Sequence, residues 1–230
     1  LVPVLCAGPQ TQIVDIFTAS RGTVSFMAKT GKGGRLKAPL LAPLAMVEVG
    51  FRWRQQRPLQ QLDEVQTAFP YSSLGTDPLK TTLAMFLQEF LYHVLKNEVA
   101  NEPLYRFVEQ SMRWLDREDD GLANFHLTFM MRLTHYLGLW PCTEDWHEGC
   151  YFDLNDGVMT DTMPPHRFWL SANDTARIPL ITRMNYRSMR LFRMNRAQRN
   201  FILDCLLAYY RLHVPEFPEL KSGNSGTCRR

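Results

Sequence analysis

Hydrophobic and polar residues alternate with a period of two along most of the first 69 residues, which is typical of β-strands. The segment TQIVDIFT places Ile13, Asp15 and Phe17 on one face and the intervening residues on the other. Gly50 lies inside a later alternating segment and predicts a bulge or a bend. Five short strands are expected, at residues 1–6, 11–18, 22–29, 44–54 and 59–69. Together with one long basic loop, they predict a small closed barrel of the OB type.

From residue 76 onward the hydrophobic positions recur every three or four residues, so the rest of the chain is predicted to be helical. Asp77 followed by Pro78 is a helix start signal, and Asn195 and Pro215 mark the start and the end of the last helix. Helices are expected at residues 78–95, 101–117 and 120–138, around Pro179, and at 195–214. The chain is therefore predicted to be α+β, with the strands first and the helices after them.

The change of period also predicts the domain organisation. An OB-fold nucleic-acid-binding domain is expected at residues 1–75 and an α-helical domain at residues 76–222. The helical domain contains a turn-rich insert at residues 140–173, which we interpret as a degenerate zinc-finger-like element. Residues 223–230 have the composition of a disordered tail.

Charge is distributed in blocks, although the formal net charge of the 230 residues is only +3. Residues 1–58 contain eight Lys and Arg against two acidic residues, and residues 59–174 contain seven basic and eighteen acidic residues. Residues 175–203 contain seven arginines and no acidic residue. Two basic blocks that flank an acidic one indicate a charged partner such as a polyanion, or contacts between the blocks themselves.

The glycine-rich segment around residues 29–37 is either a solvated hairpin loop or a mobile cationic finger, and the charge blocks favour the finger. The segment FRWRQQR adds arginines beside Phe51 and Trp53, which are either base-stacking residues or alternating core residues. If the segment after Pro179 is helical, Arg183, Arg187 and Arg190 share a face that the next three arginines continue. The predicted DNA-binding residues are Lys29, Lys32, Arg35, Lys37, Arg52, Arg54, Arg57, Arg183, Arg187, Arg190, Arg193, Arg196 and Arg199.

No motif typical of catalysis is found, so the protein is predicted not to be an enzyme and to need no cofactor. Cys142, His147 and Cys150 are at most three zinc ligands, whereas a structural zinc site needs four, so no metal is expected. DLNDGVMTD resembles a calcium loop but has its glycine one position early. The acidic cluster at residues 116–120 is interpreted as a solvated helix junction rather than a nuclease centre.

The expected location is a reducing cytoplasm. Five scattered cysteines do not suggest a disulfide framework, and no hydrophobic run approaches the ~20 residues that span a bilayer. The start LVPVLCAG lacks the basic region and the adequate hydrophobic region of a secretory signal.

The order of these parts resembles the RecO family of bacterial recombination and repair proteins, in its Bacteroidetes form. The resemblance covers residues 11–222 and lies in an ordered series of segments rather than in one motif. These segments include TQIVDIFTASRGTVSFMAK, NEPLYRFVEQSMRWLD, ANFHLTFMMRLTHYLGLWP, YFDLNDG and NRAQRNFILDCLLAYYRLHVPEFPELKS. It implies an N-terminal OB fold and a C-terminal helical domain. Some members of the family hold zinc with two CxxC pairs near the insert, which this chain lacks.

The resemblance also implies a function. It implies that the protein binds single- and double-stranded DNA, anneals complementary strands and acts with RecR to load RecA on strands coated by SSB. The acidic, hydrophobic tail of SSB needs an apolar pocket with a cation at its edge. We predict that this pocket is formed by Arg113, Phe129, Arg132 and Leu133, although either arginine can instead pair with a neighbouring carboxylate. An alternative function is a protein-interaction scaffold whose basic surfaces bind acidic partner tails and bind DNA only weakly.

Overall fold

The structure is a computed structural model that describes residues 4–5, 11–29, 40 and 42–220. The chain divides into two compact units, Leu1–Glu118 (unit 1) and Asp119–Arg230 (unit 2). Unit 1 contains six strands followed by two helices, and unit 2 contains helices and a small sheet, counted over the described residues. The prediction of an α+β chain with its strands first is confirmed. The boundary predicted between residues 75 and 76 remains a prediction.

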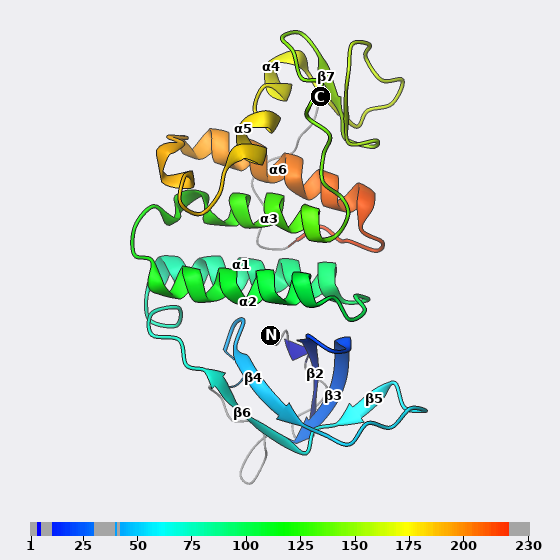
Figure 1. Cartoon of the computed structure of the whole chain (residues 1–230), viewed down its shortest axis with the longest axis vertical. Helices are drawn as coiled ribbons and strands as arrows, with labels where there is room; N and C mark the ends of the chain where they lie inside the picture. The colour runs from blue at the N-terminus through cyan, green and yellow to red at the C-terminus, as the bar shows by residue number, and fades with distance from the viewer. Residues whose placement is uncertain (1–3, 6–10, 30–39, 41, 221–230) are drawn as a thin grey trace. The chain divides into compact units, whose positions relative to one another are not determined.

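The strands of unit 1 form two sheets (Figure 1). In the first sheet the order is β1 (Val4–Leu5), β2 (Thr11–Thr18), β3 (Gly22–Lys29) and β5 (Leu59–Gln61). β2 and β3 form an antiparallel hairpin, and β5 pairs with β3 in parallel. The second sheet pairs β4 (Met46–Gly50) with β6 (Glu64–Phe69).

These sheets correct three details of the predicted barrel. The two sheets do not close into a barrel within the described residues. The single strand predicted at residues 59–69 is two strands, because the chain crosses from one sheet to the other at Leu62, which is buried and donates its N–H to the Met27 carbonyl at 3.3 Å. The register shift of β4 lies between Met46 and Val47, and Gly50 ends that strand instead of kinking its interior.

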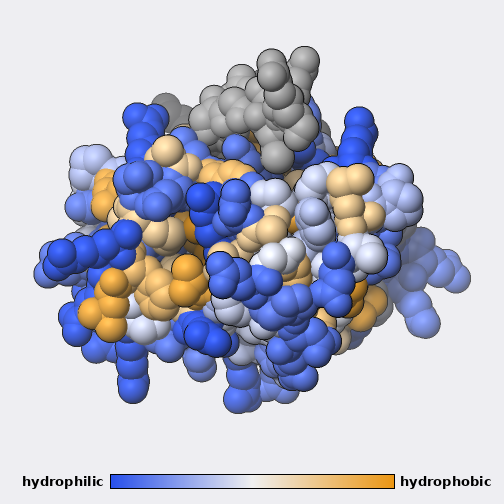
Figure 2. Space-filling model, turned by 90° about the horizontal axis from the view of Figure 1, so that it is seen from above, coloured by the Kyte–Doolittle hydropathy of each residue, from blue (hydrophilic) through white to orange (hydrophobic). Residues whose placement is uncertain are grey.

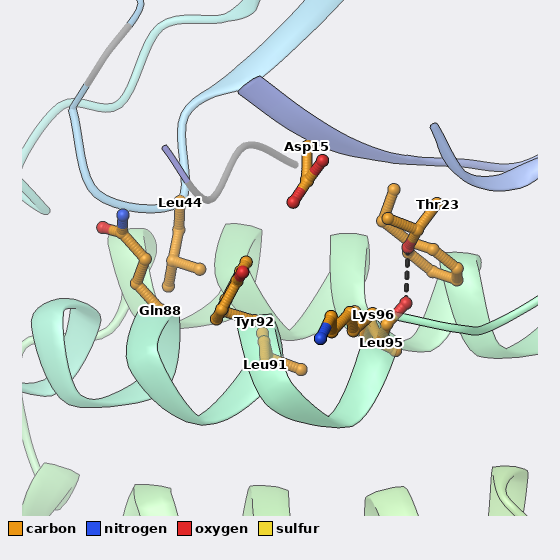
Figure 3. Close-up of a pocket in the computed structure, with 9 residues that line it drawn as sticks. Asp15, Thr23, Leu44, Gln88, Leu91, Tyr92, Leu95 and Lys96 are labelled. Atoms are coloured by element: carbon orange, nitrogen blue, oxygen red, sulfur yellow. Dashed lines mark hydrogen bonds between the residues drawn. The ribbon is translucent and has the colours of Figure 1, made fainter. Parts of the chain in front are cut away.

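Both faces of β2 are buried, so its alternating pattern does not separate a buried face from a solvated one. Val14 and Ile16 pack with Phe26 in the core of the sheets. Asp15, which is bonded to Ser25 Oγ at 2.5 Å, and Phe17 line a pocket together with Leu91 and Tyr92 of helix α1 (Pro78–Leu95). Figure 3 shows Asp15 on the side of β2 that faces this helix.

The start of β3 is fixed to the end of α1. Thr23 donates its hydroxyl to the Leu95 carbonyl at 2.5 Å (Figure 3) and its N–H to the Glu98 carbonyl at 3.0 Å. Gly22 has a φ of +70°, and a Cβ atom there would lie 2.0 Å from the Glu98 carbonyl oxygen. A glycine is therefore required at this approach.

The helices of unit 1 begin where the sequence predicts. Asp77 caps α1 by accepting the Lys80 N–H at 2.8 Å, and Asn101 caps α2 (Glu102–Arg117) by accepting the Leu104 N–H at 3.1 Å. Asp116, near the end of α2, is only 3% exposed and accepts hydrogen bonds from the backbone N–H groups of residues 72–74. Asp116 is therefore a buried anchor and not a member of a solvated acidic junction.

Unit 2 is built on two helices, α3 (Phe125–Tyr136) and α6 (Arg196–His213), with a three-stranded sheet at one end. That sheet has the order β8 (Val158–Thr160), β7 (Tyr151–Asp153) and β9 (Trp169–Leu170). The shorter elements are η2 (Leu122–Asn124), α4 (Ala172–Thr175), α5 (Ile178–Arg183) and η3 (Met189–Leu191). Figure 1 shows α5 beside α3 and α6, with α4 next to the sheet.

The insert at residues 140–173 carries this small sheet, and its predicted zinc-finger-like character is not shown. Cys142 is exposed and Cys150 is buried against Met159, with their sulfur atoms 3.9 Å apart. His147 Nε2 lies 2.8 Å from a carboxylate oxygen of Asp161. Among the described residues, no three His, Cys, Asp or Glu side chains are grouped closely enough to hold a metal.

None of the helices in the described part of the chain combines the length and the hydrophobicity needed to cross a membrane.

Candidate nucleic-acid interface

The first candidate surface is the basic loop, residues 51–58, which follows β4 and carries Arg52, Arg54 and Arg57 on exposed positions. In the described residues, none of these three guanidinium groups forms an ion pair. The backbone of the loop is nevertheless held in place. Arg57 donates its N–H to the Arg54 carbonyl at 3.1 Å, and Arg52 donates its N–H to a carboxylate oxygen of Asp63 at 3.2 Å. The loop therefore presents cations from a fixed backbone.

The two aromatic residues of the loop have different environments. Phe51 packs edge-to-face on Phe26, with ring centroids 4.8 Å apart, and belongs to the core. Trp53 is 45% exposed, and the Arg21 guanidinium lies 4.2 Å from its ring centroid. The alternative of a core residue is thus right for Phe51, whereas Trp53 forms a surface stack with Arg21.

Arg21 is a residue that the sequence pattern did not single out. It lies in the turn between β2 and β3, and only the folded structure brings it to Trp53. Lys29, at the end of β3, is exposed as expected. Lys32, Arg35 and Lys37 lie outside the described residues, so their role remains a prediction.

An open groove of about 550 Å³ borders the basic loop. It is lined by Arg52 and Arg54 on the loop, by Gln61 at the end of β5, by Asp63, and by Glu64 at the start of β6. The groove therefore has mixed charge, and the guanidinium groups are the parts of it that attract phosphate.

The second candidate surface is the arginine segment, residues 183–199 in unit 2. The prediction that its arginines share one helix face is wrong, because α5 ends at Arg183 and α6 begins only at Arg196. Asn185 interrupts the helix by accepting the N–H groups of Arg187 and Ser188, both at 3.0 Å, which is an Asx turn.

The arginine segment is fixed by contacts from elsewhere in unit 2. The Asn124 side-chain amide donates to the carbonyls of Met189 at 3.0 Å and Phe192 at 2.8 Å. Arg132 donates from Nε to the Met184 carbonyl at 3.0 Å. The irregular backbone between α5 and α6 thus has defined partners, and the arginines it carries point outward from a held chain.

Most of the predicted arginines of this segment are on the surface. Arg183, Arg187, Arg190, Arg193 and Arg196 are exposed, and none of them forms an ion pair within the described residues. Arg199 is half-buried and donates to the Met194 carbonyl, and its charge together with burial lowers the pKa of His126 to about 4, burial being the larger cause. His126 is therefore neutral near pH 7.

The start of α6 concentrates positive potential. Asn195 and Gln198 form a capping box, with side-chain hydrogen bonds of 2.9 Å in both directions. Arg196 and Arg199 occupy the first turn, where the helix dipole already favours an anion. Positive side chains at this end are repelled by the helix dipole, so binding of an external anion would reduce this repulsion.

The residues predicted to bind a partner peptide are placed differently from the expectation. Phe129 and Leu133 are fully buried, so their side chains do not reach the surface. Arg113 pairs with Glu109 at 2.8 Å and lies over the Phe69 ring, so the alternative of a carboxylate pair is right for it. Arg132 is half-buried and bonded to the Met184 carbonyl, rather than paired with a carboxylate.

An apolar groove of about 250 Å³ lies beside the arginine segment. Its lining includes Leu180, Met184, Phe192 and Met194, together with Arg193 and with Arg177, which is paired with Asp174 at 3.1 Å. Leu180 is 50% exposed, and the nearby Leu191 is 74% exposed. Figure 2 shows hydrophobic side chains exposed among hydrophilic ones on the face seen from above. The sequence pattern did not reveal this groove, because its residues come from both sides of the Asn185 turn.

An α+β chain that presents unpaired arginines from two units is typical of proteins that bind polyanions such as nucleic acids. Residues 8–71 match the family model "Recombination protein O N terminal", and residues 75–222 match "Recombination protein O C terminal". The chain therefore belongs to the RecO family of DNA repair and recombination proteins.

Relatives in Bacteroidetes agree with this assignment. The chain is 42% identical over 214 residues to a DNA repair protein RecO of Phocaeicola vulgatus, covering 92% of this chain and 89% of the relative. It is 38% identical over 215 residues to a protein of the same name in Bacteroides fragilis, with the same two coverages. A third, from Porphyromonas gingivalis, is 34% identical over 216 residues, or 91% of this chain and 88% of the relative.

Proposed function

We propose that this protein is a non-enzymatic recombination mediator that binds single- and double-stranded DNA and anneals complementary strands. The observation that carries the proposal is the pair of exposed arginine sets, on the basic loop and on the arginine segment, which have no carboxylate partner among the described residues. Arginines that are not neutralised within the protein gain counterion-release free energy when they meet phosphates.

In this proposal the strands of unit 1 are the OB fold of the family, and the glycine-rich segment extends its DNA-binding surface. Lys29 at the end of β3 would continue into Lys32, Arg35 and Lys37. Trp53 with Arg21 would provide a surface on which a base can stack, because bases stack on aromatic rings and on guanidinium planes.

The proposed partners are RecR, RecA indirectly, and the acidic tail of SSB, at the nucleoid in the bacterial cytoplasm. For the SSB tail, we place the site in the apolar groove, since a hydrophobic lining with Arg193 at the edge suits an acidic, hydrophobic peptide. Arg132 would support this groove through its bond to the Met184 carbonyl. The groove thus replaces the buried Phe129 and Leu133 as the predicted contact surface.

The test of the main proposal is a salt titration of binding to a labelled single strand, followed by an annealing assay with its complement. We expect binding at moderate salt with a linear fall of log affinity against log salt, and annealing faster than that of the naked strands. A protein that bound acidic peptides but not naked oligonucleotides would instead be the interaction scaffold. Magnesium-dependent shortening of the strand would identify a nuclease and contradict the proposal.

The groove is tested with a fluorescent SSB tail peptide. Arg193→Glu should reduce the binding free energy of the peptide by on the order of 1–3 kcal/mol, as expected for loss of a charge-assisted contact. Arg113→Glu is the matched control, because Arg113 is already paired with Glu109. Equal anisotropy curves for the two variants would exclude the groove as the peptide site.

A further inference from the structure

Gln60 is the one residue of strand β5 that is fully buried, with an exposed fraction of 1%. Its side-chain amide is directed into the basic loop. Oε1 accepts the N–H of Arg54 at 2.9 Å, and Nε2 donates to the Arg54 carbonyl at 3.0 Å and also to the Arg57 carbonyl. One side chain thus bonds three backbone groups of the loop, including both sides of the Arg54–Arg57 turn.

This arrangement has consequences for the two arginines. Residues 51–58 form neither a helix nor a paired strand, so the loop has no ladder of its own to fix it. Besides the bonds to Gln60, the loop backbone is held by the Arg57–Arg54 turn and by the bond from Arg52 to Asp63. Without the buried amide, the N–H and the two carbonyls would need other partners, and the loop would gain conformational freedom.

We propose that Gln60 is a positioning residue: it fixes the backbone of the basic loop so that Arg54 and Arg57 meet phosphates without first being ordered. This inference rests on the proposed function, since it assumes that the loop binds DNA. A preorganised loop loses little entropy on binding, whereas a free loop must lose it at that moment. Because Gln60 itself is buried, its proposed role is to act through the arginines and not to contact the DNA.

The first variant is Gln60→Met, which has a similar volume and cannot form the three hydrogen bonds. Its matched control is Gln66→Met on β6, where the exposed amide donates to Glu48 and has no other hydrogen bond within the described residues. At a temperature well below both melting points, Gln60→Met should bind a labelled single strand about tenfold more weakly than the control, because ordering even one loop residue costs about this factor. Equal affinities of the two variants would overturn the inference. Gln60→Asn, which is polar but too short to bridge both carbonyls, serves the same comparison if Gln60→Met does not fold.

A positioning role predicts that the effect of Gln60→Met on DNA affinity depends on Arg54 and Arg57, whereas a purely structural role does not. In a background with Arg54→Gln and Arg57→Gln, Gln60→Met should alter the affinity by less than twofold, because the groups it positions are gone. If Gln60→Met lowers affinity by the same factor in both backgrounds, its effect does not pass through the arginines and the inference is wrong.

The same variants distinguish this inference from the proposed function. Arg54→Gln with Arg57→Gln should reduce the salt slope on a single strand by about 0.7 for each phosphate that is no longer neutralised. An unchanged slope would mean that the loop does not bind DNA, which rejects the positioning role and leaves the proposed function to rest on the arginine segment. A reduced slope together with no effect of Gln60→Met would leave DNA binding in place and reject the positioning role alone.

Discussion

At the scale of single residues, Asp116 is the side chain on which unit 1 most visibly depends. It accepts the N–H groups of Ser72, Ser73 and Leu74 at 2.8–3.0 Å, and Lys80 donates to the Asp116 backbone carbonyl at 3.0 Å. Asp116→Ala should lower the free energy of unfolding by about 3 kcal/mol, because three backbone donors, one in a buried and two in partly buried hydrogen bonds, lose a charged acceptor. Urea denaturation measures this loss. Asp120→Ala, at an exposed position nearby, should change it by less than about 0.5 kcal/mol.

The same residue predicts an acid dependence of stability. Burial alone would raise the pKa of Asp116, but the hydrogen bonds from residues 72–74 outweigh it and lower the pKa from 3.8 to about 2. Between these values the unfolded chain binds the proton more tightly, so the stabilisation is complete above pH 4 and is lost as the pH falls toward 2. At about 1.36 kcal/mol per unit, the difference is about 2 kcal/mol. Between pH 5 and pH 2, the free energy of unfolding of the parent should therefore fall by about this much more than that of Asp116→Ala. Parallel curves of unfolding free energy against pH for the two proteins would contradict the prediction.

At the scale of elements, the role of the arginine segment can be tested by comparing two double variants that have the same net charge. Replacing Arg187 and Arg190 by Gln removes two exposed arginines that have no described carboxylate partner. The salt slope of single-strand binding should fall by about 0.7 for each. In the control, Arg106→Gln with Arg113→Gln removes the same charge from arginines paired with Glu102 and Glu109. If both double variants lower the slope equally, net charge and not this surface determines binding.

Element boundaries were predictable from the sequence where the signal is local. Asp77 with Pro78, and Asn195 with Gln198, start helices through hydrogen bonds that span three residues, so the pattern alone specifies them. The hairpin of β2 and β3 is local in the same sense. The split of residues 59–69 into β5 and β6 was not predictable, because it depends on the pairing of each half with a strand far away in sequence.

The candidate site also combines features that local sequence predicts with features that depend on contacts between distant residues. The arginines were identifiable as blocks of charge, and their exposure to solvent was predictable because a charged guanidinium group loses its hydration when it is buried. Their arrangement was not identifiable, because Asn124 and Asn185 hold the arginine segment in an irregular path that the regular spacing of the arginines conceals. Gln60 and Arg21 carried no signal at all, since a glutamine and a turn arginine acquire their roles only through contacts with residues 53–57.

At the scale of the whole molecule, the presence of an arginine surface on each of two units suggests that annealing needs both. A single surface is enough to bind one strand, but bringing two strands together requires that each strand be neutralised, which reduces the repulsion between their phosphates. Two triple variants separate these contributions. One replaces Arg52, Arg54 and Arg57 of unit 1 by Gln, and the other replaces Arg187, Arg190 and Arg193 of unit 2.

We expect each triple variant to keep binding to a single strand through the remaining surface, with a smaller salt slope. At protein concentrations that saturate the strands, annealing should nevertheless be at least about tenfold slower than with the parent, because a second strand no longer finds a cationic surface. Strand annealing followed by fluorescence transfer between labelled complements measures the rate, and binding is measured on the same samples. An annealing rate that matches the parent at equal saturation, in either variant, would show that one surface is sufficient and that the other serves a different partner.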